Sequence, residues 1–208
     1  MSEPTKYRLE LRGRIVESAT SMFREKGIRS VRMDDIASCL TISKRTLYEI
    51  YENKEVLLCE VVEKLHKFDM EQMEELKKSS TSSMDFLIGI IRLRMRQVNR
   101  VNPVFYKEMM KYPKVWSLIE QYRCDSRTHS IDIIKKGVEE GYLLSNVNYK
   151  LIQAIADKMF QDSMASEYKD FDIRELFKIT IILFIRSVCT ERGIRMLDDF
   201  LVEMNEER

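Results

Sequence analysis

The chain has 208 residues, of which 44% are hydrophobic and 33% are charged, and its formal net charge is +1. This length can bury a sizeable core in one or two domains, whereas six glycines and three prolines leave little turn material for an all-β fold. The net charge is close to zero, so the chain as a whole is not a polycation. The longest uncharged apolar run covers residues 179–185, which is far shorter than the roughly 20 residues that cross a membrane.

Charge is distributed unevenly along the chain. Residues 1–54 hold 11 Lys and Arg against 8 Asp and Glu, a net charge of +3, and the remainder holds 24 against 26, a net charge of −2. A positive N-terminal segment (the head, residues 1–54) followed by a nearly neutral remainder (the body) is compatible with DNA binding by the head. This charge difference alone does not establish DNA binding. The four cysteines show no C-x-x-C spacing, so we expect reduced thiols in a cytoplasmic protein.

The first predicted helix covers residues 6–26. Its apolar residues recur three or four positions apart and form one stripe: Leu11, Ile15, Ala19, Met22 and Phe23. Gly27 follows as a C-cap glycine. A second helix is predicted to begin near Met33, where Asp34 and Asp35 complement the helix dipole.

Residues 33–54 are predicted to form two short helices joined by a tight turn. Ser43 suits the N-cap of the second helix, residues 44–51. Leu47, Ile50 and Tyr51 share its inner face at i, i+3 and i+4. A helix this short does not form alone in water, so this face must pack on neighbouring helices.

The outer face of the same helix carries Lys44, Arg45, Thr46, Tyr48 and Glu49. Cations bind phosphates and guanine edges, and hydroxyls bind the sugar-phosphate backbone, so the pattern suits a recognition helix. An ordinary helical hairpin with a solvated basic end explains the same residues. The residue chemistry alone does not choose between these two interpretations.

A resemblance to a known family favours the first interpretation. The DNA-binding region of the TetR family of bacterial transcriptional regulators is similar to residues 8–58, through Asp35-Ile36-Ala37, Ile42-Ser43, Thr46-Leu47-Tyr48 and Asn53-Lys54-Glu55-Val56-Leu57. The chain departs from the usual pattern where alanine, glycine and phenylalanine are common: Leu40, Thr41 and Tyr51. A residue other than glycine in that turn is strained if its φ is positive.

The resemblance implies six DNA-binding positions: Arg32, Lys44, Arg45, Thr46, Tyr48 and Lys54. Tyr48 and Lys54 match phosphate contacts, the latter at a helix N-terminus where an amide, the dipole and an ammonium favour an anion. Arg45 is the expected guanine reader, because its planar fork can bond O6 and N7 together. Arg32 replaces the usual hydroxyl residue and can contact a phosphate, but it cannot supply a hydroxyl cap.

The remaining segments also follow a helical period. They predict an all-α fold of about nine helices, with a helix-turn-helix domain over residues 1–53 and a helical ligand-binding and dimerisation domain over residues 54–208. The helices after the head are expected at residues 54–78, 84–101, 104–111, 114–140, 150–167 and 173–192, with a final turn or helix to about residue 204. By composition, residues 179–185 also suit a buried strand.

The body contains many methionine and aromatic residues, which suit an adaptable pocket for a small apolar or amphipathic effector. Core packing explains the same residues equally simply. The resemblance implies a pocket in the body, for which the candidates are Phe86, Ile90, Arg94, Phe105, Met109, Trp116, Tyr122 and Phe160. Arg94 and Gln97 are its candidate polar groups.

The resemblance further implies a homodimer that places two recognition helices on a near-palindromic operator in double-stranded DNA. The candidate dimer contacts are Ile152, Ile155, Met159, Ile179, Ile182 and Ile185. We therefore expect a repressor that an effector releases from its operator, with no cofactor, metal or membrane partner. The alternative is a helical adaptor that binds proteins and has only non-specific DNA affinity. An enzyme is disfavoured, because no acid–base cluster, Walker loop or G-x-S-x-G motif is present.

Overall fold

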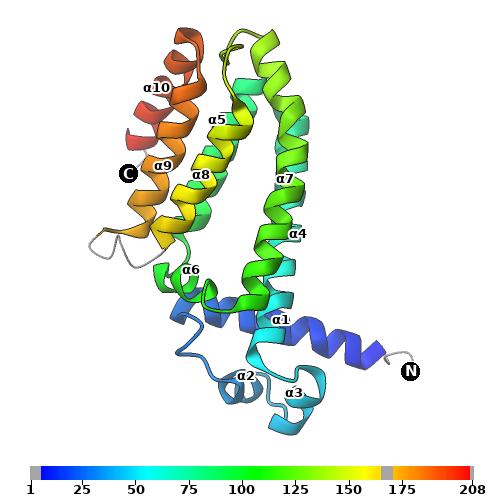
Figure 1. Ribbon diagram of the computed structural model, residues 1–208. Helices are drawn as coiled ribbons and strands as arrows, with labels where there is room; N and C mark the ends of the chain where they lie inside the picture. The colour runs from blue at the N-terminus through cyan, green and yellow to red at the C-terminus, as the bar shows by residue number, and fades with distance from the viewer. Residues whose placement is uncertain (1–5, 165–170, 207–208) are drawn as a thin grey trace. The chain divides into compact units, whose positions relative to one another are not determined.

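The computed structural model describes residues 6–164 and 171–206, and these residues confirm the all-α fold (Figure 1). They form ten helices and no strand longer than a single bridge, one helix more than expected. The helices are α1 (Lys6–Lys26), α2 (Met33–Cys39), α3 (Lys44–Ile50), α4 (Lys54–Ser79), α5 (Ser83–Asn99), α6 (Pro103–Met109), α7 (Pro113–Glu139), α8 (Tyr149–Met164), α9 (Ile173–Val188) and α10 (Glu191–Glu206).

The chain folds into two compact units, each built from two segments. The first unit comprises Met1–Met70 and Val101–Arg123, and the second comprises Glu71–Arg100 and Cys124–Arg208. The first unit therefore joins α1–α3 to the start of α4, to α6 and to the start of α7. Its core is filled by the stripe predicted on α1, and Ile15, Ala19 and Phe23 are completely buried. The predicted domain boundary after residue 53 stays a prediction.

The second unit contains α5, α8, α9 and α10, together with the ends of α4 and α7. Within it, α9 packs beside both α8 and α10 (Figure 1). Its separate core includes Met84 and Ile91 of α5 and Leu197 and Phe200 of α10. Residues 179–185 lie inside α9, which resolves the helix–strand ambiguity of that run in favour of helix.

The end of α9 corrects the sequence interpretation. The helix was expected to continue to residue 192 and to stop at Gly193, but it ends at Val188, and Gly193 lies inside α10. A β-bridge pairs Cys189 with Leu143, and the Thr190 amide donates to the Tyr142 carbonyl at 2.9 Å. These non-local bonds redirect the backbone, and the Thr190 hydroxyl accepts from the Gly193 amide at 3.3 Å to begin the next helix.

The described helices include none that combines the length and the apolar character needed to cross a membrane.

Candidate nucleic-acid interface

Helices α2 and α3 are held on the first unit by their inner faces. Ile36 and Ala37 of α2 are buried, as are Leu47 of α3 and Tyr51 at its C-cap. Neither seven-residue helix is stable by itself, so this burial supports both. The predicted inward face of α3 is confirmed, because Leu47 and Tyr51 are buried and Ile50 is half-buried against the same core.

The turn between α2 and α3 is closed by backbone bonds. The Ile42 amide donates to the Ala37 carbonyl at 3.0 Å, and the Thr41 amide donates to the Ser38 carbonyl at 3.1 Å. This pair of bonds is a Schellman motif, which requires a left-handed residue after the C-cap. Thr41 occupies that position with φ of 56°. The expected strain of a non-glycine residue in this turn is therefore present.

Replacing Thr41 with glycine is expected to raise the free energy of unfolding by roughly 0.5–1 kcal/mol. A β-carbon in the left-handed region costs about 1–2 kcal/mol, and the greater freedom of glycine in the unfolded chain returns about 0.4–1 kcal/mol of that gain. The Thr41 side chain is exposed, so no core contact is lost. Urea unfolding of the full chain, with an unchanged m-value, measures the difference.

Thr41→Ala is the matched control for this prediction. It removes the hydroxyl and methyl groups but keeps the β-carbon, so most of the backbone strain remains. Equal stabilities of the alanine and glycine variants would show that the left-handed conformation is not the source of the strain.

Local capping positions the start of α3. The Ser43 hydroxyl accepts from the Thr46 amide at 3.0 Å, which confirms the predicted N-cap. The same hydroxyl lies 2.8 Å from the Thr46 hydroxyl, and Thr46 is half-buried. Of the outward positions predicted on α3, Thr46 alone is thus partly enclosed in the structure.

Both cations of α3 face acidic side chains. Lys44 forms an ion pair with Asp34 of α2, and Arg45 Nε lies 2.9 Å from Glu49 Oε1, one turn further along α3. The Arg45 side chain is 88% exposed. Exposed pairs of this kind are weak and are screened by salt, so a phosphate or a base edge can displace the carboxylates. The contact with Glu49 uses the Nε atom of Arg45 and not its two terminal nitrogens.

Tyr48 and Arg32 are exposed beside this helix pair. Tyr48 points outward from α3 with 48% of its surface accessible. Arg32 is the N-cap residue of α2, and its own amide donates to Asp35 Oδ2 at 2.7 Å. In that bond the Asp35 carboxylate accepts from the N-cap amide, which is one half of a capping box, whereas the Arg32 guanidinium cannot accept from the free amides of the first turn.

Lys54, expected as a phosphate contact, is engaged within the protein. Its ammonium donates to the Ile28 carbonyl at 2.9 Å, in the loop between α1 and α2. Burial lowers the pKa of Lys54, and the nearby carboxylates of Glu108 and Asp35 oppose that shift. Lys54 thus ties the start of α4 to the loop that carries α2, and its contact with DNA stays a prediction.

A second network joins α1 to the start of α4. Arg12 Nη2 lies 2.7 Å from Glu60 Oε2, which also accepts from the Tyr51 hydroxyl at 2.7 Å. Burial, followed by the bond to Glu60, raises the pKa of Tyr51 above its usual range. The Tyr51 departure from the family pattern is therefore accommodated by Glu60. On the neighbouring turn, Arg8 donates to the Glu49 carbonyl at 3.0 Å.

The candidate effector residues fall in both compact units. Phe105 is buried in the core of the first unit, where Met109 and Tyr122 pack against it, and Trp116 belongs to the same unit. The second unit holds Phe86, Ile90 and Arg94 on α5, and the side chain of Phe160 lies outside the described residues. Their assignment to an effector site stays a prediction.

The candidate dimer residues divide by exposure. Ile155, Met159 and Ile179 are exposed, whereas Ile152, Ile182 and Ile185 are half-buried. Two further exposed residues, Leu151 and Leu183, extend the same faces at helical spacing. We call the following set the α8–α9 apolar face: Leu151, Ile155, Met159, Ile179 and Leu183.

Sequence reasoning missed the acidic partners of the α3 cations. Glu49 was visible as a neighbour of Arg45, because residues four apart meet on a helix surface. Asp34 lies ten residues before Lys44, and only the folded turn brings the two together.

Comparisons with known proteins agree with this geometry. Residues 15–61 match the family model of bacterial regulatory proteins, tetR family. The transcriptional repressor KstR2 of Mycobacterium tuberculosis is 24% identical over 147 residues, covering 68% of this chain and 73% of the relative.

Solved structures share the fold over most of the chain. A transcriptional regulator from Cytophaga hutchinsonii has a TM-score of 0.66 at 19% identity, covering 88% of this chain and 98% of that chain. A regulator from Saccharomonospora viridis, solved in complex with choline, has a TM-score of 0.67 at 18% identity, covering 88% and 100%. Residues 15–61 thus match the DNA-binding region of the TetR family of bacterial transcriptional regulators, and most of the chain is similar to regulators of that type.

Proposed function

We propose that this regulator is a repressor that binds a near-palindromic operator as a homodimer through α3 and leaves it when a small effector binds. The observation that carries the proposal is the outward face of α3, on which Lys44, Arg45 and Tyr48 are exposed while Leu47 anchors the helix in the core. A rigid helix with exposed cations and a phenol can supply both phosphate contacts and base contacts.

Each exposed residue has a proposed role at the DNA. Arg45 reads a guanine through its terminal nitrogens, and Lys44 and Tyr48 contact phosphates or a neighbouring base edge. Arg32 and Lys54 add phosphate contacts at the starts of α2 and α4, where helix N-termini favour anions. For Lys54 this role requires that its ammonium serve the Ile28 carbonyl and a phosphate together, which three donor hydrogens allow.

Regulators of this family act as dimers on operator DNA. We assign the dimer contact of this chain to the α8–α9 apolar face. Five large apolar side chains exposed on two adjacent helices form the kind of patch that a partner subunit covers. Two-fold symmetry then places two α3 helices in successive major grooves, about 34–36 Å apart.

The proposed effector is a small apolar or amphipathic molecule. Support comes from relatives of the same fold, which include a ketosteroid regulator, a fatty acid degradation regulator and the regulator solved with choline. An effector releases the operator only to the extent that it binds the DNA-free conformation more tightly than the DNA-bound one.

Selection of tight binders from a random duplex pool tests the function. We expect an enriched near-palindrome that binds about 10³-fold or more tightly than random DNA and whose affinity falls steeply with salt. If no sequence is enriched and the affinity only follows salt, the head is a non-specific anchor. A protein partner would then be the target to identify.

A further inference from the structure

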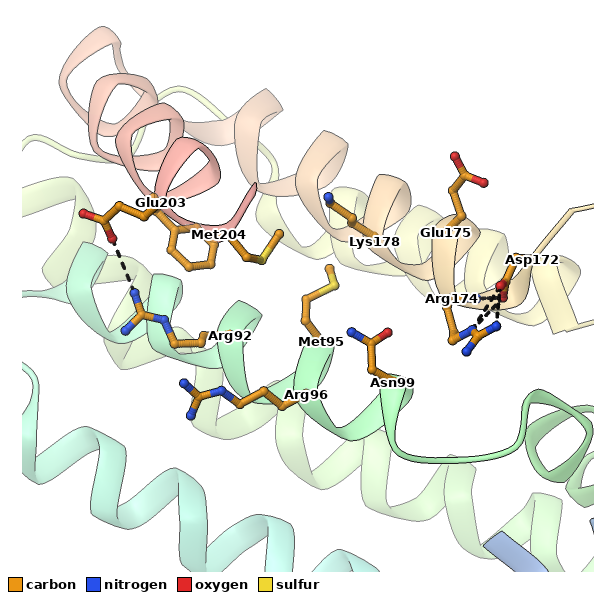
Figure 2. Close-up of a pocket in the computed structure, with 11 residues that line it drawn as sticks. Arg92, Met95, Arg96, Asn99, Asp172, Arg174, Glu175, Lys178, Glu203 and Met204 are labelled. Carbon is orange, nitrogen blue, oxygen red and sulfur yellow. Dashed lines mark hydrogen bonds and ion pairs between the residues drawn. The ribbon is translucent and has the colours of Figure 1, made fainter. Parts of the chain in front are cut away.

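A cavity of about 550 Å³ lies in the second unit, where α5, α9 and α10 face one another (Figure 2). This volume falls in the range of roughly 300–1,000 Å³ that is usual for small-molecule sites. On α5 the lining residues Arg92, Met95, Arg96 and Asn99 recur at helical spacing and share one face. None of the eight candidate effector residues lines this cavity, so it is a separate candidate for a ligand site.

One part of the cavity is apolar. Met95 and Phe200 line it and are almost completely buried, and Met204 of α10 lies beside them (Figure 2). Methionine side chains adapt to ligands of different shape. These three residues therefore provide a surface on which a hydrocarbon group can pack.

Ion pairs already neutralise four charged residues of the lining. Arg92 Nη2 lies 3.7 Å from Glu203 Oε2 at one end, and Arg174 Nη2 lies 2.7 Å from Asp172 Oδ2 at the other (Figure 2). The charges in the middle of the cavity are thus the ones that can select a ligand.

Between these ends, positive charge is in excess. Lys178 of α9 is half-buried, and neither Lys178 nor Arg96 has an ion-pair partner among the side chains that the structure describes. The remaining carboxylate, Glu175, points away from α5, whereas Met95 and Asn99 project from α5 toward α9 (Figure 2). A partly buried ammonium is stabilised when an anion binds to it.

We propose that this cavity binds a small amphipathic anion. Its charged group lies against the Lys178 ammonium, with the Asn99 amide as a neutral donor, and its hydrocarbon part packs on Met95 and Phe200. A charge-assisted bond from an ammonium to an oxyanion is stronger than a bond between neutral groups, so the anionic group provides selectivity and the hydrocarbon provides apolar burial. This ligand site is independent of the operator interface on α3.

Binding of decanoate to the full 208-residue chain, measured by calorimetry, tests the proposal. We expect saturable binding with one site per chain. Lys178→Met keeps the length of the side chain but removes its charge, and it should weaken binding about tenfold. Lys178→Arg should retain binding. Lys135→Met is the matched control, because Lys135 is an exposed lysine of the same unit on α7 and does not line the cavity.

Methyl-labelled methionine locates the ligand without depending on any variant. Decanoate should shift the methyl resonances of Met95 and Met204, assigned through Met95→Leu and Met204→Leu. Decanol, which is neutral, should bind at least about tenfold more weakly than decanoate, and decyltrimethylammonium should not compete. The proposal is overturned if decanoate does not bind, if decanol or the cation binds equally well, or if both methyl resonances stay unchanged while decanoate binds.

Discussion

Replacing Leu183 with aspartate is expected to convert the dimer into monomers and to weaken operator binding by about 100-fold or more. Leu183 is 54% exposed on the α8–α9 apolar face. A two-fold interface repeats each substitution in both subunits, so two carboxylates would be buried without partners in an apolar contact. A monomer also loses the second α3 helix, whose binding the dimer makes intramolecular.

Sedimentation equilibrium measures the first effect, and titration of the selected operator measures the second. Val202→Asp is the matched control, because Val202 is 58% exposed on α10 and lies outside the α8–α9 apolar face. It introduces the same charge into a helix at similar exposure. If Leu183→Asp remains dimeric, or if Val202→Asp dissociates equally, the dimer contact lies elsewhere.

Replacing Arg45 with alanine is expected to weaken binding to the selected operator by about tenfold per half-site, and therefore by about 100-fold for the dimer. Loss of a bidentate contact to guanine produces an effect of this size at each site. Affinity for random DNA should fall much less, because only a general electrostatic contact is lost there. The ratio of operator affinity to random-DNA affinity, measured at one salt concentration, should be compared between the wild-type protein and Arg45→Ala.

Arg195→Ala is a matched control for this substitution. Arg195 is an exposed arginine on α10 that also pairs with a glutamate one helical turn away, Glu191, at 3.5 Å. It should leave operator binding unchanged.

Glu49→Gln should change operator affinity in the opposite direction to Arg45→Ala. It should raise the affinity for DNA, since it removes the carboxylate that competes for Arg45. Equal selectivity in wild-type protein and Arg45→Ala would exclude Arg45 as the base reader.

Local sequence determined the ends of most helices. Gly27 has φ of 84° and ends α1 as expected, and the Ser43 hydroxyl caps α3. Both signals act within one helical turn, so they are visible without knowledge of the fold. The buried faces of α1 and α3 were predictable for the same reason, because helical spacing alone brings their apolar residues together.

The tertiary structure decided what the charged residues of the head do. Lys54 resembles a phosphate ligand by its place in the motif, but its partner here is the Ile28 carbonyl, 26 residues earlier. Arg12 of α1 pairs with Glu60, 48 residues later, a contact that no local pattern indicates. Long side chains reach partners that are distant in sequence, so helical period and capping rules carry no information about them.

The same limit explains the end of α9. Glycine is typical of the position after a helix end, yet Gly193 lies inside α10. A glycine is required there because a β-carbon would lie 2.4 Å from the Tyr142 carbonyl oxygen. The glycine is needed for close packing against the segment that also pairs with Cys189. The sequence by itself therefore determined the helical character of the chain and the outward face of α3, since both depend on neighbours within a few residues. Only the tertiary structure decided the break between α9 and α10 and the cavity beside them, because both arise from contacts between segments far apart in the chain.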